Sequence, residues 1–259
     1  MAELDLSKAR ILVSNDDGIN ATGIGVLERI ARTLSEDVWV VAPEVEQSAA
    51  SHSLTIHRPL RIKQLGDKRY TVDGTPTDCV LLAINHIMGD RRPDLVLSGV
   101  NHGNNIGEDV TYSGTIAAAM EATLLGIRAI AMSQRIVGMN RVYWETAEHF
   151  GPEVVRKAVA VDWPRHVLVN VNFPDCPPDQ VTGIQVVPHG NRKVGDELIQ
   201  RLDPRGKPYF WIGPVRGEQE VPVESDIHVV THGGISVTPI YLDLTHYAAL
   251  ESLRGAFAR

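Results

Sequence analysis

Cysteine is scarce in this sequence, and long apolar runs are missing. Only Cys79 and Cys176 are present among the 259 residues. Two thiols so far apart in the chain predict reduced side chains rather than a disulfide framework. No stretch approaches the ~18 uninterrupted apolar residues of a membrane-spanning helix, and residues 1–10 lack the apolar core of a signal peptide. We therefore expect a cytoplasmic protein without a membrane partner.

Positive charge is also in short supply. The chain has 25 Lys and Arg residues against 32 Asp and Glu residues, a formal net charge of −7. A surface for duplex nucleic acid needs clustered cations that displace counterions from phosphates, so we expect no duplex partner. An anionic substrate would have to find its counter-charge elsewhere. The 43% apolar and 22% charged residues are typical of a globular protein, and the length suits one or two domains.

Strand-like and helix-like patterns alternate through the first half of the chain. Short continuous apolar runs are typical of parallel strands that are covered on both faces. Such strands are expected at residues 10–14, 38–42, 93–98 and 127–132. Helices are expected at residues 24–34, 75–88 and 114–125, and extended segments at 54–63 and 70–72. This alternation predicts a doubly wound α/β protein with a mostly parallel sheet.

The alternation weakens in the second half. A helix is expected near residues 142–161, and strands at 166–172 and 236–241. Residues 174–224 are rich in proline and glycine, which is typical of long hairpins or arms, and we interpret them as elements for oligomerisation. A last helix is indicated by the apolar spacing of Tyr247, Leu250, Leu253 and Phe257.

Polar sequences follow three of the expected strands. They are Asn15-Asp16-Asp17-Gly18, the segment from Pro43 to Ser48, and Ser98-Gly99-Val100-Asn101. Ligands bind beyond the carboxyl ends of strands in an open parallel sheet, so these loops should converge at one edge. Taken singly, each of them is equally typical of an ordinary turn.

Two adjacent carboxylates at such an edge point to a cation. Asp16 and Asp17 would repel and raise each other's pKa unless a positive charge lies between them. No Lys or Arg occurs in the ten residues that follow, so a metal ion is the natural neutraliser. The Ser48 hydroxyl and the Asn101 amide oxygen complete a set of hard oxygen donors, which favours magnesium, manganese or calcium over zinc.

The loop from Gly99 to Ser113 carries a second signal, because it leads into an expected helix. Free N–H groups and the positive end of the dipole make a helix N-terminus suited to anions. The Ser113 and Thr115 hydroxyls, on either side of Gly114, could donate to phosphate oxygens. The alternative that Ser113 only caps the helix stays open.

Familiar catalytic motifs are absent. The sequence has no Walker A pattern, no GxGxxG spacing, no GxSxG elbow and no HExxH pair.

Several segments in register resemble the SurE survival-protein family. They are SNDDG at 14–18, QSAASHSLT at 47–55, GTPTDC at 74–79, SGVNHGNNIGEDVTYSGTIAAAMEA at 98–122 and SVTP at 236–239, with DPRG at 203–206 and WIGP at 211–214. The resemblance spans nearly the whole chain. Family members usually carry Ser-Gly-Ala where this chain has Ser48-Ala49-Ala50, and Thr-Asp with Gly-Tyr where it has Ser225-Asp226 and Gly233-Gly234-Ile235.

The resemblance implies one SurE-like domain over residues 1–259, with a Rossmann-like core in 1–135 and further core elements and oligomerisation arms in 136–259. It implies a homodimer or homotetramer that exchanges C-terminal segments. It also implies a metal-dependent 5′-nucleotidase that hydrolyses nucleoside 5′- and 3′-monophosphates, with short polyphosphate as a further substrate.

The converging polar loops and the family resemblance point to the same site. The metal ligands implied by the resemblance are Asp16, Asp17, Ser48 and Asn101, which would bind one Mg²⁺ or Mn²⁺ per subunit, with Ca²⁺ also able to occupy the site. Asp16 and Asp17 are the expected catalytic residues, since either could orient or deprotonate the attacking water. The expected phosphate contacts are Asn15, Ser113, Gly114 and Thr115. A nucleotide or polyanion sensor without turnover is the alternative function.

Overall fold

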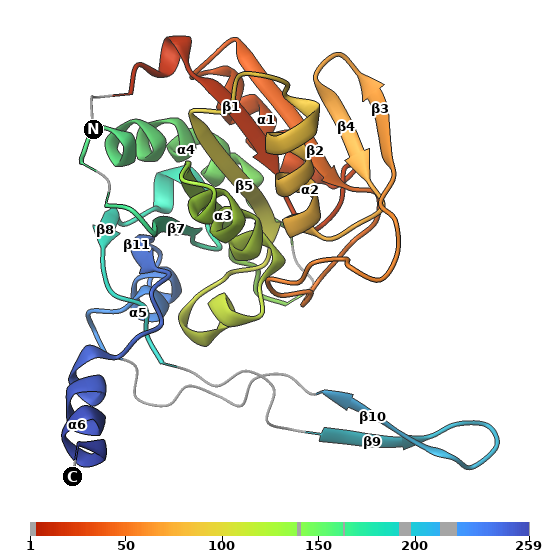
Figure 1. Cartoon of the computed structure of the whole chain (residues 1–259), viewed down its shortest axis with the longest axis vertical. Coiled ribbons are helices and arrows are strands. Elements are labelled where there is room, and N and C mark those ends of the chain that lie inside the picture. The colour runs from red at the N-terminus through yellow and green to blue at the C-terminus, as the bar shows by residue number, and fades with distance from the viewer. Residues whose placement is uncertain (1–3, 139–140, 163, 192–197, 213–221, 259) are drawn as a thin grey trace.

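A single sheet of nine strands runs through the main body of the protein, in the order β3-β4-β2-β1-β5-β6-β7-β11-β8 (Figure 1). The computed structural model describes residues 4–138, 141–162, 164–191, 198–212 and 222–258. The strands of the sheet are β1 (Arg10–Ser14), β2 (Asp37–Pro43), β3 (Ile62–Gly66), β4 (Arg69–Val72), β5 (Leu95–His102), β6 (Arg128–Gln134), β7 (Val167–Phe173), β8 (Ile184–Val186) and β11 (Ile235–Tyr241). Strands β4, β2, β1, β5, β6 and β7 are parallel to their neighbours in that order, whereas β3 and β11 are antiparallel to β4 and β7.

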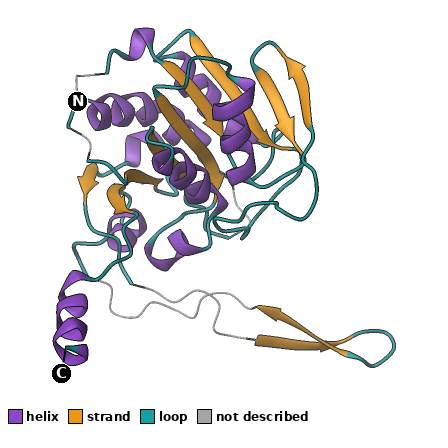
Figure 2. Ribbon diagram, in the orientation of Figure 1, coloured by secondary structure: helices purple, strands orange, loops and turns teal. Residues whose placement is uncertain are grey.

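Helices cover both faces of this sheet (Figures 1 and 2). They are α1 (Thr22–Arg32), α2 (Pro76–Leu82), α3 (Gly114–Leu124) and α4 (Trp144–Val159), followed by the later helices α5 (Asp226–Thr231) and α6 (Tyr247–Phe257). The packing of strand β1 on both faces of the sheet explains why its sequence is continuously apolar. Ile11 and Val13 are buried in the cluster under α1 and α4, and Leu12 is buried in the opposite cluster under α2 and α3. The prediction of a doubly wound, mostly parallel α/β sheet is therefore confirmed.

Some boundaries differ from those expected. Strand β5 continues to His102 because Asn101 and His102 pair with Ser133 and Gln134 of β6, so the loop expected from Gly99 begins at Gly103. The second helix starts as predicted, with a Thr75–Asp78 capping box, but α2 ends at Leu82 and a π-helical turn, Ala83–Ile87, follows.

The segment expected to form arms is divided between two places. Strand β8 pairs with β11 in the main sheet, which the composition of the segment did not indicate. A separate hairpin, β9 (Leu198–Leu202) and β10 (Pro208–Ile212), extends away from the body in Figure 1. Residues 192–197 and 213–221 of the predicted arm, including part of the WIGP motif, lie outside the described residues.

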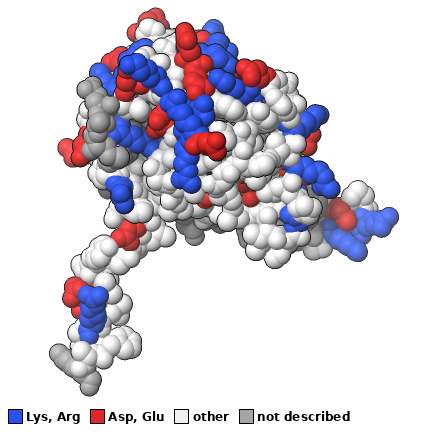
Figure 3. All heavy atoms as spheres, turned by 45° about the horizontal axis from the view of Figure 1, so that its top comes forward, with Lys and Arg blue, Asp and Glu red and all other residues white. Residues whose placement is uncertain are grey.

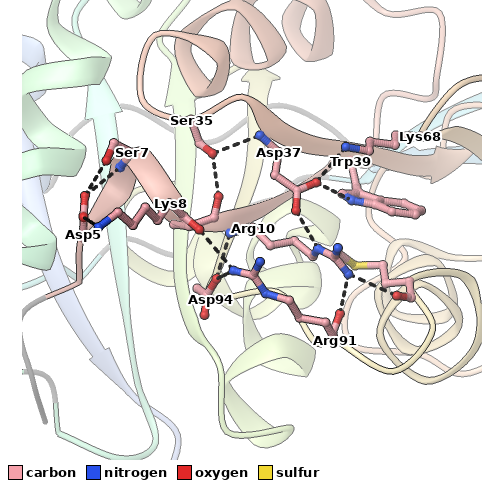
Figure 4. Close-up of polar contacts among 12 residues, drawn as sticks. Asp5, Ser7, Lys8, Arg10, Ser35, Asp37, Trp39, Lys68, Arg91 and Asp94 are labelled. Carbon is pink, nitrogen blue, oxygen red and sulfur yellow. Dashed lines mark hydrogen bonds and ion pairs between the residues drawn. The ribbon is translucent and has the colours of Figure 1, made fainter.

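A polar network joins the amino-terminal ends of the central strands (Figure 4). Asp37, at the start of β2, accepts hydrogen bonds from Arg10 Nε at 2.8 Å, Lys68 Nζ at 2.9 Å and Trp39 Nε1 at 2.9 Å. Burial favours the neutral acid, but these hydrogen bonds outweigh it and lower the pKa of Asp37 to about 2. Strands β1 and β2 are thereby held together at the edge opposite to the expected site.

Charged side chains of both signs lie beside one another over the face displayed in Figure 3. Glu28 of α1 pairs with Arg32 at 2.8 Å and with Arg69 at 2.7 Å, and Arg29 pairs with Glu148 at 2.8 Å.

Both cysteines are free thiols, as predicted. No helix in the described ranges combines the length and the apolar composition that crossing a membrane requires.

Candidate functional site

The loops that follow β1, β2 and β5 meet around Asp16 and Asp17. The Gln47 N–H of the loop after β2 donates to the Asp16 carbonyl oxygen at 2.8 Å. The His102 N–H at the end of β5 donates to Asp17 Oδ2 at 3.0 Å. Residues that are far apart in the chain are thus brought to one edge of the sheet, as the order of the strands requires.

The first turn of α3 packs directly against Asp16. The Thr115 hydroxyl donates to Asp16 Oδ1 at 2.5 Å. A Cβ atom at Gly114 would lie 2.6 Å from Asp16 Cβ and 2.9 Å from Asp16 Oδ2, so only glycine permits this approach. The positive end of the α3 dipole therefore faces the Asp16 carboxylate.

Both carboxylates are held in surroundings that oppose their ionisation. Asp16 is 4% exposed, and this burial, together with the charge of Asp17, raises its pKa to about 6 against the opposing hydrogen bond from Thr115. Partial burial likewise raises the pKa of Asp17, with a further contribution from Glu46, while the His102 N–H acts in the opposite direction. Within the described part of the chain, neither carboxylate forms an ion pair with Lys or Arg.

Ser48 and Asn101 lie in the loops that converge on the two aspartates. The Ser48 side chain is exposed, and its hydroxyl donates to Glu46 Oε1 at 2.6 Å rather than to Asp16 or Asp17. Asn101 Nδ2 donates to the Gly103 carbonyl oxygen at 2.9 Å, which leaves Oδ1 as its atom for a ligand. Asn101 is therefore already oriented, whereas Ser48 would have to rotate away from Glu46 to bind a metal.

The side chains expected to contact phosphate already form hydrogen bonds within the protein. Ser113 caps α3, since its Oγ accepts from the Ile116 N–H at 3.1 Å, as the simpler interpretation of the sequence expected. The Thr115 hydroxyl is committed to Asp16. Asn15 is fully buried, and its Nδ2 donates to the Gly18 carbonyl oxygen at 3.0 Å, which stabilises the turn that carries the two aspartates.

A buried asparagine network supports the site loop, which we define as residues 103–113, directly after β5. The Asn105 N–H donates to Asn172 Oδ1 at 2.8 Å, and the Asn105 carbonyl oxygen accepts from Asn170 Nδ2 at 2.7 Å and from Asn172 Nδ2 at 3.1 Å. Asn105 Nδ2 donates to Ser133 Oγ at 2.8 Å. This support was not predicted from the sequence, although the two asparagines in the otherwise apolar strand β7 indicate buried polar groups that need partners.

The donor set fits a hard divalent cation. Among the described residues, no three His, Cys, Asp or Glu side chains group in a way that could hold a metal, so a cation at this edge would rely on two carboxylates and neutral oxygens. Asn15 Oδ1, next to Asp16 in the chain, is buried without a partner in the described structure. Two carboxylates without a described basic partner are the arrangement that a cation would stabilise.

Comparison with known proteins gives consistent results. A sequence profile of the family described as "Survival protein SurE" matches residues 11–196. A protein from Paramagnetospirillum magneticum named 5′-nucleotidase SurE is 59% identical over 253 residues, which cover 98% of this chain and 97% of that protein. A protein of the same name from Rhodospirillum rubrum is 56% identical over 257 residues, which cover 98% of each chain.

A solved structure agrees as well. The crystal structure of the SurE protein from Aquifex aeolicus superposes with a TM-score of 0.83 at 38% sequence identity, covering 95% of this chain and 98% of that one. With its sheet order, its converging loops and its relatives in agreement, this chain belongs to the SurE survival-protein family.

Proposed function

We propose that this protein is a metal-dependent 5′-nucleotidase, which hydrolyses nucleoside 5′- and 3′-monophosphates to nucleoside and phosphate. The shared name of the relatives, at 50–59% identity over nearly the full chain, supports phosphoric monoester hydrolysis. One observation carries the mechanism: Asp16 and Asp17 lie together at the carboxyl edge of the sheet with no described basic partner. Short polyphosphate is a further candidate substrate, because it presents the same terminal phosphoryl group.

The proposed ligands for one Mg²⁺ or Mn²⁺ ion are Asp16, Asp17, Ser48 and Asn101, and Ca²⁺ would fit the same oxygen donors. When bound, such a cation polarises phosphoryl oxygens and offsets their negative charge. This would supply the positive charge that the net charge of −7 lacks. The Thr115 hydroxyl holds Asp16 in place, and the hydrogen bond to Gly103 orients Asn101.

The start of α3 would bind the phosphate. Ser113 can donate its hydroxyl proton, since its oxygen already accepts from Ile116, and the Gly114 N–H lies at the positive end of the helix. Thr115 and Asn15 would act on the phosphate indirectly, through Asp16 and through the turn. Asp17, less buried than Asp16, is the better placed to orient water and accept its proton as the water oxygen bonds to phosphorus. The ester P–O bond breaks in the same displacement, and the nucleoside oxygen leaves with the electron pair and takes a proton from solvent to become a hydroxyl.

Assembly into a homodimer or homotetramer is part of this proposal. Apolar side chains are exposed on the hairpin and on α6, among them Phe210, Trp211, Ile212, Leu253 and Phe257. A groove of about 360 Å³ between α4 and strands β7, β8 and β11 is lined almost entirely by apolar side chains. Large apolar surfaces of this kind mark interaction sites.

The free thiols of Cys79 and Cys176 support a reducing compartment such as the cytoplasm.

A phosphate-release assay on nucleoside monophosphates tests the proposed function. We expect turnover to disappear in EDTA and to return with Mn²⁺ or Mg²⁺. Asp17→Asn should lower kcat at least a hundredfold, equivalent to about 2.7 kcal/mol of barrier, in a protein that keeps its fold. Nucleotide binding without phosphate release would favour the sensor, and turnover unaffected by EDTA would contradict the metal.

A further inference from the structure

Asp226 is a buried carboxylate outside the predicted metal and phosphate site. It is the first residue of α5, it is 0% exposed, and within the described ranges no Lys or Arg pairs with it. Backbone N–H groups surround it instead: Asp226 Oδ1 accepts from Gly190 at 2.6 Å and from Ile227 at 2.7 Å, and Oδ2 accepts from Gly107 at 2.9 Å. The two glycines belong to different parts of the molecule, so this carboxylate connects them.

On one side, Asp226 closes the base of the hairpin segment. The Asp226 N–H donates to the Pro188 carbonyl oxygen at 3.0 Å, which adds to the bond from Gly190 to the side chain. The chain between Gly190 and Asp226 carries β9 and β10, which extend from the body in Figure 1. We call Pro188–Gly190, together with Asp226, the root of the hairpin.

On the other side, Asp226 holds the site loop. Gly107 begins the 3-10 turn Gly107–Thr111, which leads to Ser113 and the start of α3. The preceding residue, Ile106, is buried against Ile227 and Val230 of α5. Helix α5 therefore binds the loop through one hydrogen bond to a carboxylate and one apolar cluster.

We propose that Asp226 is a positioning residue that ties the site loop to the root of the hairpin, so that a displacement of the root changes the groups that bind metal and phosphate. This inference rests on the proposed nucleotidase function for its effect on turnover, although the tie itself does not. A buried N–H without an acceptor is unfavourable, so the loop and the root keep their places only while the carboxylate accepts from both.

Asp226→Asn is the direct test. The amide keeps the size of the side chain but replaces one acceptor oxygen with a donor, which leaves either the Gly107 or the Gly190 N–H unpaired. We expect kcat to fall about tenfold and the Mn²⁺ concentration for half-maximal activation to rise, because Asn101 at the end of β5 is oriented by its hydrogen bond to Gly103, the first residue of the site loop.

Ser225→Ala is the matched control. Ser225 caps α5, since its Oγ accepts from the His228 N–H at 3.3 Å and donates to the Pro222 carbonyl oxygen at 2.7 Å, but it bonds neither glycine. The control weakens the helix while leaving the tie intact, so kcat and the Mn²⁺ requirement should stay within about twofold of the unchanged protein. If Ser225→Ala reproduces the losses of Asp226→Asn, Asp226 only stabilises α5 and the proposal is wrong.

A second variant tests the tie without touching Asp226 or measuring activity. A Cβ atom at Gly190 would lie 2.7 Å from Ile227 Cδ1, 3.1 Å from Ile227 Cγ1 and 3.3 Å from Ser225 Cβ, so Gly190→Ala has to shift either the root or the buried Ile227 side chain that packs on Ile106 of the site loop. We expect the Gly107 amide to exchange with deuterium about tenfold faster in Gly190→Ala and in Asp226→Asn. If the Gly107 amide is as protected in both folded variants as in the unsubstituted protein, the tie is wrong. If the unsubstituted protein releases no phosphate but its Gly107 amide is protected, only the proposed nucleotidase function is wrong.

Discussion

At Asp16, burial opposes the charge that metal binding requires. In the folded protein, burial raises the pKa of the Asp16 carboxyl group from its ordinary value of 3.8 to about 6. Between those two values the folded state binds more protons than the unfolded state, so the free energy of unfolding of the metal-free protein decreases as the pH rises through this window. Above it, the ionised carboxylate costs about 3 kcal/mol of stability.

Asp16→Asn should therefore make the metal-free protein more stable while removing a proposed ligand. At pH 8 in EDTA we expect the free energy of unfolding to rise by about 2–3 kcal/mol, with the gain falling to about 0.5 kcal/mol at pH 4. Denaturant unfolding at both pH values measures this. Asp17→Asn, at a less buried position, should give a smaller gain. An Asp16→Asn protein that is less stable at pH 8 would show that the carboxylate is not penalised by burial.

Single residues also mark the limit of what the sequence could predict. The sequence placed Asp16 and Asp17 after a buried strand, and strand order alone then brought them to the carboxyl edge. From the sequence, the Thr115 hydroxyl could donate to phosphate, and nothing there indicated that it donates to Asp16, 99 residues away. The type of a residue and its element can be inferred locally, but the partner of a hydroxyl depends on packing between elements.

At the scale of elements, long periodic segments were predictable and short ones were not. Strands β1, β2 and β6 lie within a few residues of the predicted positions because each contains a short apolar run. Helix α5 has six residues and β8 has three, too few for a period to emerge from the sequence. Strand β5 runs past its predicted end because pairing with β6 outweighs the turn preference of Gly and Asn.

The contact between α3 and the turn after β1 gives a prediction for the N-terminus of this helix. Gly114→Ala would improve helix propensity by about 1 kcal/mol, but its Cβ would overlap Asp16. We expect the overlap to dominate, so that α3 moves away, Thr115 loses Asp16, and kcat falls at least tenfold. The matched control is Gly25→Ala in α1, whose nearest neighbour would be Arg29 Nη1 at 3.8 Å. Equal activity in the two variants would contradict the close approach.

The proposed site, the network that joins the strands and the proposed assembly surfaces lie in different parts of the molecule. The carboxyl edge of the sheet carries the polar loops, and the amino edge carries the Arg10–Asp37 network that joins the strands (Figure 4). The hairpin and α6 extend from the body (Figure 1). Their exposed apolar side chains lie outside the central clusters, and these are the surfaces that the proposed assembly would bury.

Helix α6 offers a specific test of that assembly. Leu253 and Phe257 are 55% and 87% exposed on the same face, since residues four apart on a helix are neighbours. Leu253→Glu combined with Phe257→Glu should lower the mass measured by light scattering, because a buried interface cannot accept two unpaired carboxylates. Ser252→Glu adds charge to the opposite face of α6 and should leave the mass unchanged. If the double variant keeps the mass of the unchanged protein, or if the unchanged protein is already a monomer, α6 does not mediate assembly.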